Sequence, residues 1–153
     1  MNATIIEAVH RSVTVNVPPK QAFEVFVGQI GTWWPLETHS VAAMGDAGRP
    51  DEVVLEAREG GEMYDWRGEK RHHWATVTAW EPPHRLVLDW KVNPDWPAPT
   101  EVEITFTPAG GGTRLDLEHR GWERLGDIAP ESRASYNDGW VPVLDRFGQA
   151  ASA

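Results

Sequence analysis

Two neighbouring histidines, His72 and His73, are the first candidates for chemistry, because imidazole is a common metal ligand. They open the run HHWATVTAWE, whose composition predicts a β-strand. Adjacent side chains of a strand point to opposite faces of the sheet, so the two rings cannot bind one ion together. We therefore expect no metal site at this pair.

His119 is a second candidate. Leu115, Leu117 and His119 alternate with the acidic residues Asp116 and Glu118, which places the histidine on the inward face of a predicted strand. An imidazole in an apolar pocket can act as a general acid or base. The alternative is a core histidine, or a histidine at a strand end in contact with solvent, and the pattern favours that alternative.

Asp65 and Tyr136 complete the set of polar candidates. Asp65 shares a strand face with Met63, where it would either bind a polar group of a ligand or accept an indole N–H. An internal hydrogen bond is favoured, because buried polar groups are usually satisfied within the protein. Tyr136 belongs to the apolar stripe of a predicted C-terminal helix and is the member best suited to direct a hydroxyl into a cavity.

The sequence lacks the motifs of several enzyme classes. It contains no cysteine, which excludes disulfides, thiolate metal sites and cysteine nucleophiles and predicts a reducing, cytoplasmic location. A Ser-His-Asp order, a phosphate-binding glycine loop and a dinucleotide fingerprint are also absent. We expect no cofactor, and we assign no catalytic residues; a binding protein is favoured over an enzyme.

Nine tryptophans are many for 153 residues. Each buries about 150–250 Å² and carries an N–H that needs an acceptor, so a dry core of nine is unfavourable. We expect several of them to border a rim or a wet cavity. Trp33 and Trp34 stand side by side in GQIGTWWPLETHS, and both rings are buried only if something encloses this bend. They would either line the mouth of a cavity or cap a filled core.

Hydrophobic periodicity predicts the elements that position these residues. Alternating valines indicate a strand over 12–17, followed by an amphipathic helix from Lys20 that closes near Gly28 to Gly31 and by a short helical bend. Period-two alternation then predicts six more strands, within 53–57, 62–66, 72–81, 85–92, 102–106 and 113–120. Glu101, Glu103, Asp116 and Glu118 would form a solvated outer face.

A long C-terminal helix ends the predicted fold. Pro130 and Glu131 introduce an apolar stripe with helical spacing, formed by Tyr136, Trp140, Val143, Leu144 and Phe147. Gly139 and Pro142 inside it cost about 1 and 3 kcal/mol relative to alanine, so we expect the helix to bend there and infer a packing reason. The order of elements predicts one α+β domain over 1–153, an antiparallel sheet with helices on one face.

Charge and hydropathy limit the partners. Aspartate and glutamate number 23 against 14 lysines and arginines, a net charge of −9, and basic residues do not cluster. A nucleic-acid backbone would be repelled. No segment approaches the roughly 20 apolar residues of a membrane span.

The sequence resembles the START-like helix-grip (SRPBCC) superfamily and, within it, the group similar to activators of the heat-shock protein 90 ATPase. The resemblance rests on SVTVNVPPKQAFEVF, on GGEMYDWRGEKRHHWATVTAWEPPHRLVLDW, and on GW before VPVLDRF, which together span nearly the whole chain. It implies a curved seven-stranded antiparallel sheet wrapped around the C-terminal helix, often enclosing an apolar cavity. The superfamily has no universal catalytic motif, so the resemblance says little about activity.

These observations favour a protein that binds a small hydrophobic or aromatic ligand between the sheet and the long helix. The residues expected to line that cavity are Trp33, Trp34, Met63, Asp65, Trp90, His119, Tyr136 and Trp140. One alternative is a cyclase- or lyase-type enzyme that uses His119, Asp65 and Tyr136. Another is a co-chaperone-like regulator, ranked third because the eukaryotic activators carry a separate N-terminal chaperone-binding domain. An exposed strand edge would also allow a homodimer.

Overall fold

A computed structural model describes residues 6–44 and 48–152. Its seven strands form one antiparallel sheet in the order β1-β7-β6-β5-β4-β3-β2. The strands are β1 Val9–Val15, β2 Glu52–Leu55, β3 Glu62–Arg67, β4 Lys70–Glu81, β5 Arg85–Trp90, β6 Thr100–Ala109 and β7 Gly112–Arg120. The helices are α1 Pro19–Gly28, α2 Ile30–Trp33, α3 Val41–Met44, the 3₁₀ segment η1 Trp122–Ile128 and α4 Ala129–Ala151. The predicted α+β helix-grip fold is confirmed.

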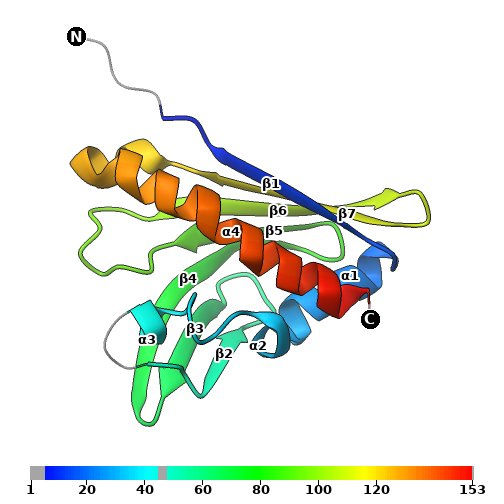
Figure 1. Cartoon of the computed structure of the whole chain (residues 1–153), viewed down its shortest axis with the longest axis horizontal. Helices are drawn as coiled ribbons and strands as arrows, with labels where there is room; N and C mark the ends of the chain where they lie inside the picture. The colour runs from blue at the N-terminus through cyan, green and yellow to red at the C-terminus, as the bar shows by residue number, and fades with distance from the viewer. Residues whose placement is uncertain (1–5, 45–47, 153) are drawn as a thin grey trace.

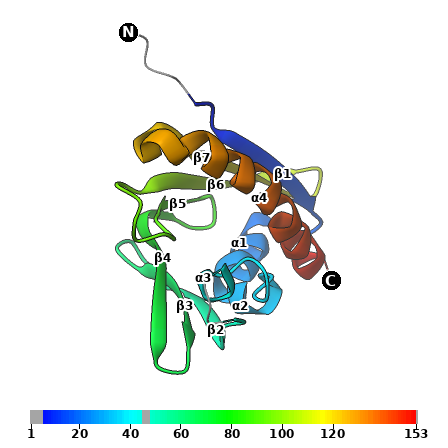
Figure 2. The ribbon, with the colours of Figure 1, turned by 60° about the vertical axis from the view of Figure 1, so that its left-hand side comes forward.

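The sheet is strongly curved, and all the helices lie on its inner side. Figure 2 shows the strands bending from β1 round to β2, with α1–α3 and α4 inside the curve. The register shifts at Met63/Tyr64 and at Val77/Ala79, where β4 pairs with its two neighbours. Such bulges bend a strand and increase its twist, so they account for curvature at this end of the sheet.

The 23-residue helix α4 crosses the inner face of the sheet (Figure 1). It continues through Gly139 and Pro142 without interruption. Two arginines fix its position against the first strand and the segment before it. The Arg11 guanidinium donates to the carbonyl oxygen of Asn137 at 2.7 Å, and Arg133 donates to that of Glu7 at 2.7 Å. These bonds hold the N-terminal half of α4 beside β1.

The predicted short helical bend after α1 is the separate turn α2. Gln29 leaves the helical conformation, and Ile30 begins the separate turn α2. Gly31 allows this turn to lie close to β2, because a Cβ there would come within 3.2 Å of the carbonyl oxygen of Val53. The turn ends at Trp33, and Trp34 is already extended, so consecutive tryptophan side chains can both face inward.

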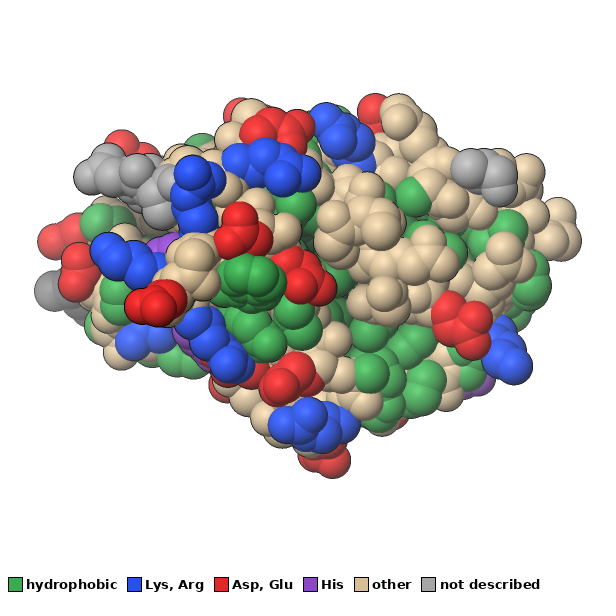
Figure 3. All heavy atoms as spheres, turned by 90° about the horizontal axis from the view of Figure 1, so that it is seen from below, with side chains coloured by type: hydrophobic (Ala, Val, Ile, Leu, Met, Phe, Trp, Pro, Cys, Tyr) green, Lys and Arg blue, Asp and Glu red, His purple; other side chains and the backbone are tan. Residues whose placement is uncertain are grey.

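The face of the molecule that is seen from below in Figure 3 carries both charged and hydrophobic side chains. Figure 3 shows acidic and basic side chains interspersed there, with patches of hydrophobic side chains between them. No described helix is both long enough and apolar enough to cross a membrane.

Candidate functional site

A pocket of about 230 Å³ lies between the sheet and α4. We call it the aromatic pocket, because five large aromatic rings make up much of its wall. It is lined by Trp34, Thr38, His39, Val41, Trp74, Trp90, Val92, Ser135, Tyr136, Gly139, Trp140 and Val143.

The five rings come from four separate segments. Trp34 follows α2, Trp74 lies on β4 and Trp90 on β5, and Tyr136 and Trp140 are four residues apart on α4. Residues at this helical spacing share one face, so both α4 rings turn towards the sheet. Ring centroids lie 5.2 Å apart for Trp34 and Trp74 and 5.4 Å apart for Trp90 and Trp140, in edge-on or tilted contact. Such pairs contribute about 0.5–1.5 kcal/mol each beyond their burial.

Tyr136 contributes a buried hydroxyl to this wall, which Thr38, His39 and Ser135 also line with polar groups. The indole N–H of Trp90 donates to its hydroxyl oxygen at 3.0 Å. Burial raises the pKa of Tyr136 to about 12, because the phenolate would lose hydration, so the hydroxyl keeps its proton at neutral pH. Among the described residues no acceptor receives that proton. The hydroxyl is therefore a hydrogen-bond donor available to a molecule in the pocket.

His119 lies behind the pocket wall, fully buried, and does not line the pocket. The indole N–H of Trp140 donates to its Nδ1 at 3.1 Å. Because an indole can only donate, Nδ1 must be unprotonated, and Nε2 carries the proton that is shared with Thr100 Oγ1 at 2.7 Å. Desolvation lowers the pKa of His119 to about 3. His119 is a neutral core histidine that orients Trp140.

Asp65 has a similar supporting role. It is fully buried, and the N–H groups of Trp74 and of the Ala42 backbone donate to its Oδ2 at 2.9 and 3.0 Å. His72 Nδ1 lies 2.7 Å from Oδ1. The predicted internal hydrogen bond from an indole is confirmed. Asp65 thereby ties two parts of the wall together, the Trp74 ring and the α3 turn that carries Val41.

The two neighbouring tryptophans have different positions. Trp33 packs into the core against Phe26 and Phe147, with centroids 5.1 and 5.4 Å away, and its N–H donates to the Val25 carbonyl oxygen at 3.0 Å. Trp34 lines the pocket, and its N–H donates to the His39 carbonyl oxygen at 2.8 Å. One ring therefore caps the filled core, and the other borders the cavity.

His39 and Gly139 form part of the pocket wall next to Trp34. His39 Nδ1 lies 2.7 Å from the Thr38 hydroxyl, and burial is the main cause that lowers the pKa of His39. A Cβ at position 139 would lie 3.9 Å from His39 Cδ2. The absence of a side chain at Gly139 leaves more room in this part of the pocket. A Cβ there would make only an ordinary contact with His39, so the expected packing reason for this glycine is not seen.

Four of the eight residues predicted to line a cavity therefore do so: Trp34, Trp90, Tyr136 and Trp140. Trp33, Met63, Asp65 and His119 are buried behind the wall, because core contacts or internal hydrogen bonds occupy them. Sequence reasoning missed Thr38, His39 and Trp74 among others. Strand alternation gave no signal for Trp74, because the register shift between β3 and β4 passes over this residue and changes the phase of burial there. The two loop residues have no periodic context.

The adjacent histidines of β4 serve different partners. His72 bonds inward to Asp65, and His73 Nδ1 lies 2.8 Å from Glu62 Oε2. Over residues 6–44 and 48–152, no three potential ligands of the His, Cys, Asp and Glu types come together.

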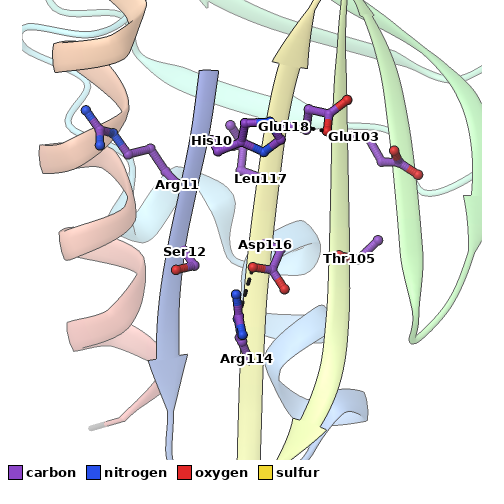
Figure 4. A pocket seen from close by; sticks show the side chains of 9 residues that line it. All are labelled: His10, Arg11, Ser12, Glu103, Thr105, Arg114, Asp116, Leu117 and Glu118. Carbon is purple, nitrogen blue, oxygen red and sulfur yellow. Dashed lines mark hydrogen bonds and ion pairs between the residues drawn. The ribbon is translucent and has the colours of Figure 1, made fainter. Parts of the chain in front are cut away.

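A larger hollow of about 650 Å³ lies across β1, β7 and β6. Figure 4 shows the side chains that line it, most of them charged or hydroxylated. Several are paired with each other: Arg114 Nε lies 3.0 Å from Asp116 Oδ1, and His10 Nε2 lies 3.6 Å from Glu118 Oε1. We call this region the charged hollow. It contains no enclosed aromatic wall, so the aromatic pocket is the better candidate for a ligand site.

The comparisons with known proteins agree with this architecture. The family model described as "Activator of Hsp90 ATPase homolog 1-like protein" matches residues 16–152. The chain belongs to this family. The comparison with curated proteins found no match.

Solved structures extend the family assignment. The anthrahydroquino-γ-pyrone synthase Txn09, complexed with SUM, is 31% identical; the match covers 95% of this chain and 97% of that one, with a TM-score of 0.63. CalU16 from Micromonospora echinospora is 21% identical, with 95% and 76% covered and a TM-score of 0.65. The Aha1 dimer from Colwellia psychrerythraea is 11% identical, with 95% and 97% covered and a TM-score of 0.64. The last two likenesses concern the fold alone.

Proposed function

We propose that this family member binds a small, flat aromatic molecule with a keto oxygen in the aromatic pocket. The observation that carries the proposal is the Tyr136 hydroxyl, which accepts a hydrogen bond from Trp90 and keeps its own proton for a ligand. Aromatic walls with a few polar groups are typical of small-molecule sites.

The size of the pocket limits the ligand. A dry cavity of roughly 150 Å³ in another protein holds benzene. The aromatic pocket measures about 230 Å³, and the additional volume has room for a second fused ring. Chromone, a neutral two-ring γ-pyrone with one keto oxygen, is therefore a suitable first probe, and its pyrone ring matches the product class named for the 31% identical synthase.

The test is a titration of the protein with chromone, followed by tryptophan fluorescence and calorimetry. Tyr136→Phe removes only the hydroxyl and should weaken binding by about 5- to 10-fold, the value of one hydrogen bond. Tyr64→Phe is the matched control, because the chain has two tyrosines and Tyr64 does not line the pocket. Absence of chromone binding in the parent, or equal affinities in the parent and Tyr136→Phe, would contradict the proposal.

A second candidate is catalysis of ring closure, and the 31% identity to a γ-pyrone synthase favours it. Tyr136 would then donate a hydrogen bond to the ketone oxygen that develops negative charge. The pKa of about 12 makes it a stabilising donor rather than an acid that gives up its proton. Asp65 and His119 do not line the pocket, so neither serves as the base that the sequence suggested.

A simple reaction tests this candidate. In 1-(2-hydroxyphenyl)butane-1,3-dione, the phenol oxygen attacks the distal ketone carbon, a C–O bond forms, and one water leaves to give 2-methylchromone. The parent protein should accelerate this cyclisation, and Tyr136→Phe should lose most of the acceleration. If chromone binds but the cyclisation rate equals that in buffer, the protein is a binding protein and the enzymatic candidate is wrong.

A further inference from the structure

A second depression borders the aromatic pocket. It measures about 540 Å³ and is lined by Val41, Val92, Asn93, Pro94, Trp96, Ile128, Glu131, Ser132, Ser135 and Tyr136. We call it the outer groove. Four of these residues also line the aromatic pocket: Val41, Val92, Ser135 and Tyr136. The two spaces therefore share one boundary, and the hydroxyl-bearing ring of Tyr136 belongs to it.

Volume is the first reason to consider both spaces together. Pockets for drug-sized ligands measure about 300–1,000 Å³, and the aromatic pocket alone falls below that range. A molecule longer than two fused rings cannot be contained there. Such a molecule would extend across the boundary with the outer groove, where it would contact additional apolar surface.

The composition of the outer groove gives a second, independent reason. Ile128 is 41% exposed and is one of two large hydrophobic side chains that the described residues leave exposed. Trp96 is only 6% exposed, and its ring centroid lies 6.4 Å from that of Tyr136. Apolar side chains that line a depression beside a pocket lose water when a ligand covers them.

Trp96 also offers a hydrogen bond. No acceptor for its indole N–H occurs in the described part of the chain, and no buried side-chain nitrogen there lacks a partner. The indole N–H of Trp96 is therefore in contact with solvent. Trp96 and Tyr136 are thus neighbouring rings, and each carries a donor that no acceptor in the described part of the chain receives.

We propose that the ligand is elongated, with a flat keto-bearing ring system in the aromatic pocket and a second, uncharged aromatic part in the outer groove. The inference rests on the proposed function and specifies its ligand class. Among the residues that the structure describes, Glu131 is the one acidic or basic side chain that lines the groove, and the protein carries a net charge of −9. An acidic group on the distal part of the ligand would meet like charge.

Chromone and flavone test this inference as a matched pair, because flavone is chromone with one added phenyl group. The parent protein should bind flavone about tenfold more tightly than chromone, since the phenyl group buries apolar surface in the groove. Ile128→Asp should remove most of that gain and leave chromone affinity within about twofold. Ile128 is exposed to solvent, so the substitution should preserve folding.

Val141→Asp is the control variant. Val141 is the other exposed large hydrophobic residue, at 52%, and it lines neither space. This variant adds the same charge and should leave the affinities for both probes unchanged. A flavone that carries a 4′-carboxylate should bind the parent more weakly than flavone, and Glu131→Gln should recover about threefold.

The outcomes separate the two proposals. Equal affinities of chromone and flavone, or flavone binding that Ile128→Asp does not change, would overturn the outer-groove inference and leave the aromatic pocket as the whole site. If neither probe binds the parent, the proposed function fails, and this inference fails with it. Loss of flavone binding in Val141→Asp as well would show a general charge effect and overturn the inference.

Discussion

The two faces of the sheet use polar groups in opposite ways. On the outer face, opposite charges pair with each other near solvent: Arg120 reaches Glu101, Glu103 and Glu118, which raises the pKa of its guanidinium through hydrogen bonds despite some burial. On the inner face, neutral N–H donors from tryptophans are matched to single buried acceptors. Many charged groups of the outer face are paired with each other, whereas on the inner face the Tyr136 hydroxyl keeps a proton at a cavity.

This difference indicates where a ligand would gain the most binding free energy. Exposed ion pairs contribute about 0–1 kcal/mol, because water and salt screen them. A buried polar group without a partner costs about 1–3 kcal/mol, so each inner acceptor is important to both the fold and the pocket. A ligand in the charged hollow would have to displace existing pairs, while a ligand in the aromatic pocket finds a donor already oriented.

The largest expected effect is on stability. Asp65→Ala leaves the Trp74 and Ala42 N–H groups without their buried acceptor and should lower the free energy of unfolding by about 3 kcal/mol. Asp116→Ala breaks an exposed pair on the outer face and should cost less than about 1 kcal/mol. Urea denaturation of both variants measures the difference. Equal losses would show that the two faces are not energetically distinct.

The second prediction concerns pH. The unfolded chain protonates His119 near the ordinary value of 6.5, but the folded protein does so only near its depressed pKa of about 3. Unfolding therefore takes up a proton between these values, and His119 makes stability fall by about 1.4 kcal/mol for each unit that the pH drops from 6.5 towards 3.

His119→Asn tests this point, because its amide oxygen can still accept from Trp140. The variant should show a shallower loss of stability between pH 6.5 and 4.5 than the parent, measured by urea denaturation at each pH. His10→Gln, which removes an exposed imidazole from the outer face, is the control. If the free energy of unfolding depends on pH with the same slope in the parent and in His119→Asn, the buried neutral histidine is not the source of that dependence.

A smaller and opposite effect is expected at Gly139. Alanine has the higher helix propensity, and its Cβ would make only an ordinary contact with His39 at 3.9 Å, so Gly139→Ala should stabilise the protein by about 0.5–1 kcal/mol. The same methyl group narrows the pocket and should weaken chromone binding severalfold. Thermal melting and calorimetry measure the two effects. A stabilised variant with unchanged affinity would place the ligand away from this part of the wall.

The smallest effect is expected in the charged hollow. Arg114→Ala should change the free energy of unfolding by no more than about 0.5 kcal/mol, less at high salt, and should leave chromone affinity unchanged. Calorimetric titration at two salt concentrations checks both statements. A clear loss of affinity would move the binding site to the outer face and reverse the comparison.

Much of the fold could be predicted because it follows from local periodicity. The alternation at Leu115, Leu117 and His119 correctly places all three on the buried face. The position at which α1 and the helical bend divide was not predicted, because Ile30 continues the helical spacing although the backbone turns at Gln29. Trp96 has no periodic context in its proline-rich loop, and its packing on Tyr136 depends on α4.

By itself, the sequence determined which side chains face inward and that many of them are large and aromatic, since strand and helix periods are local properties. Only the tertiary structure decided which inward residues border a cavity and which support it. The deciding bonds join residues distant in the chain: Trp74 with Asp65 over 9 positions, Trp140 with His119 over 21, and Trp90 with Tyr136 over 46. A polar group is available to a ligand only if no internal hydrogen-bond partner occupies it. Local sequence patterns do not show which partner each group finds in the fold.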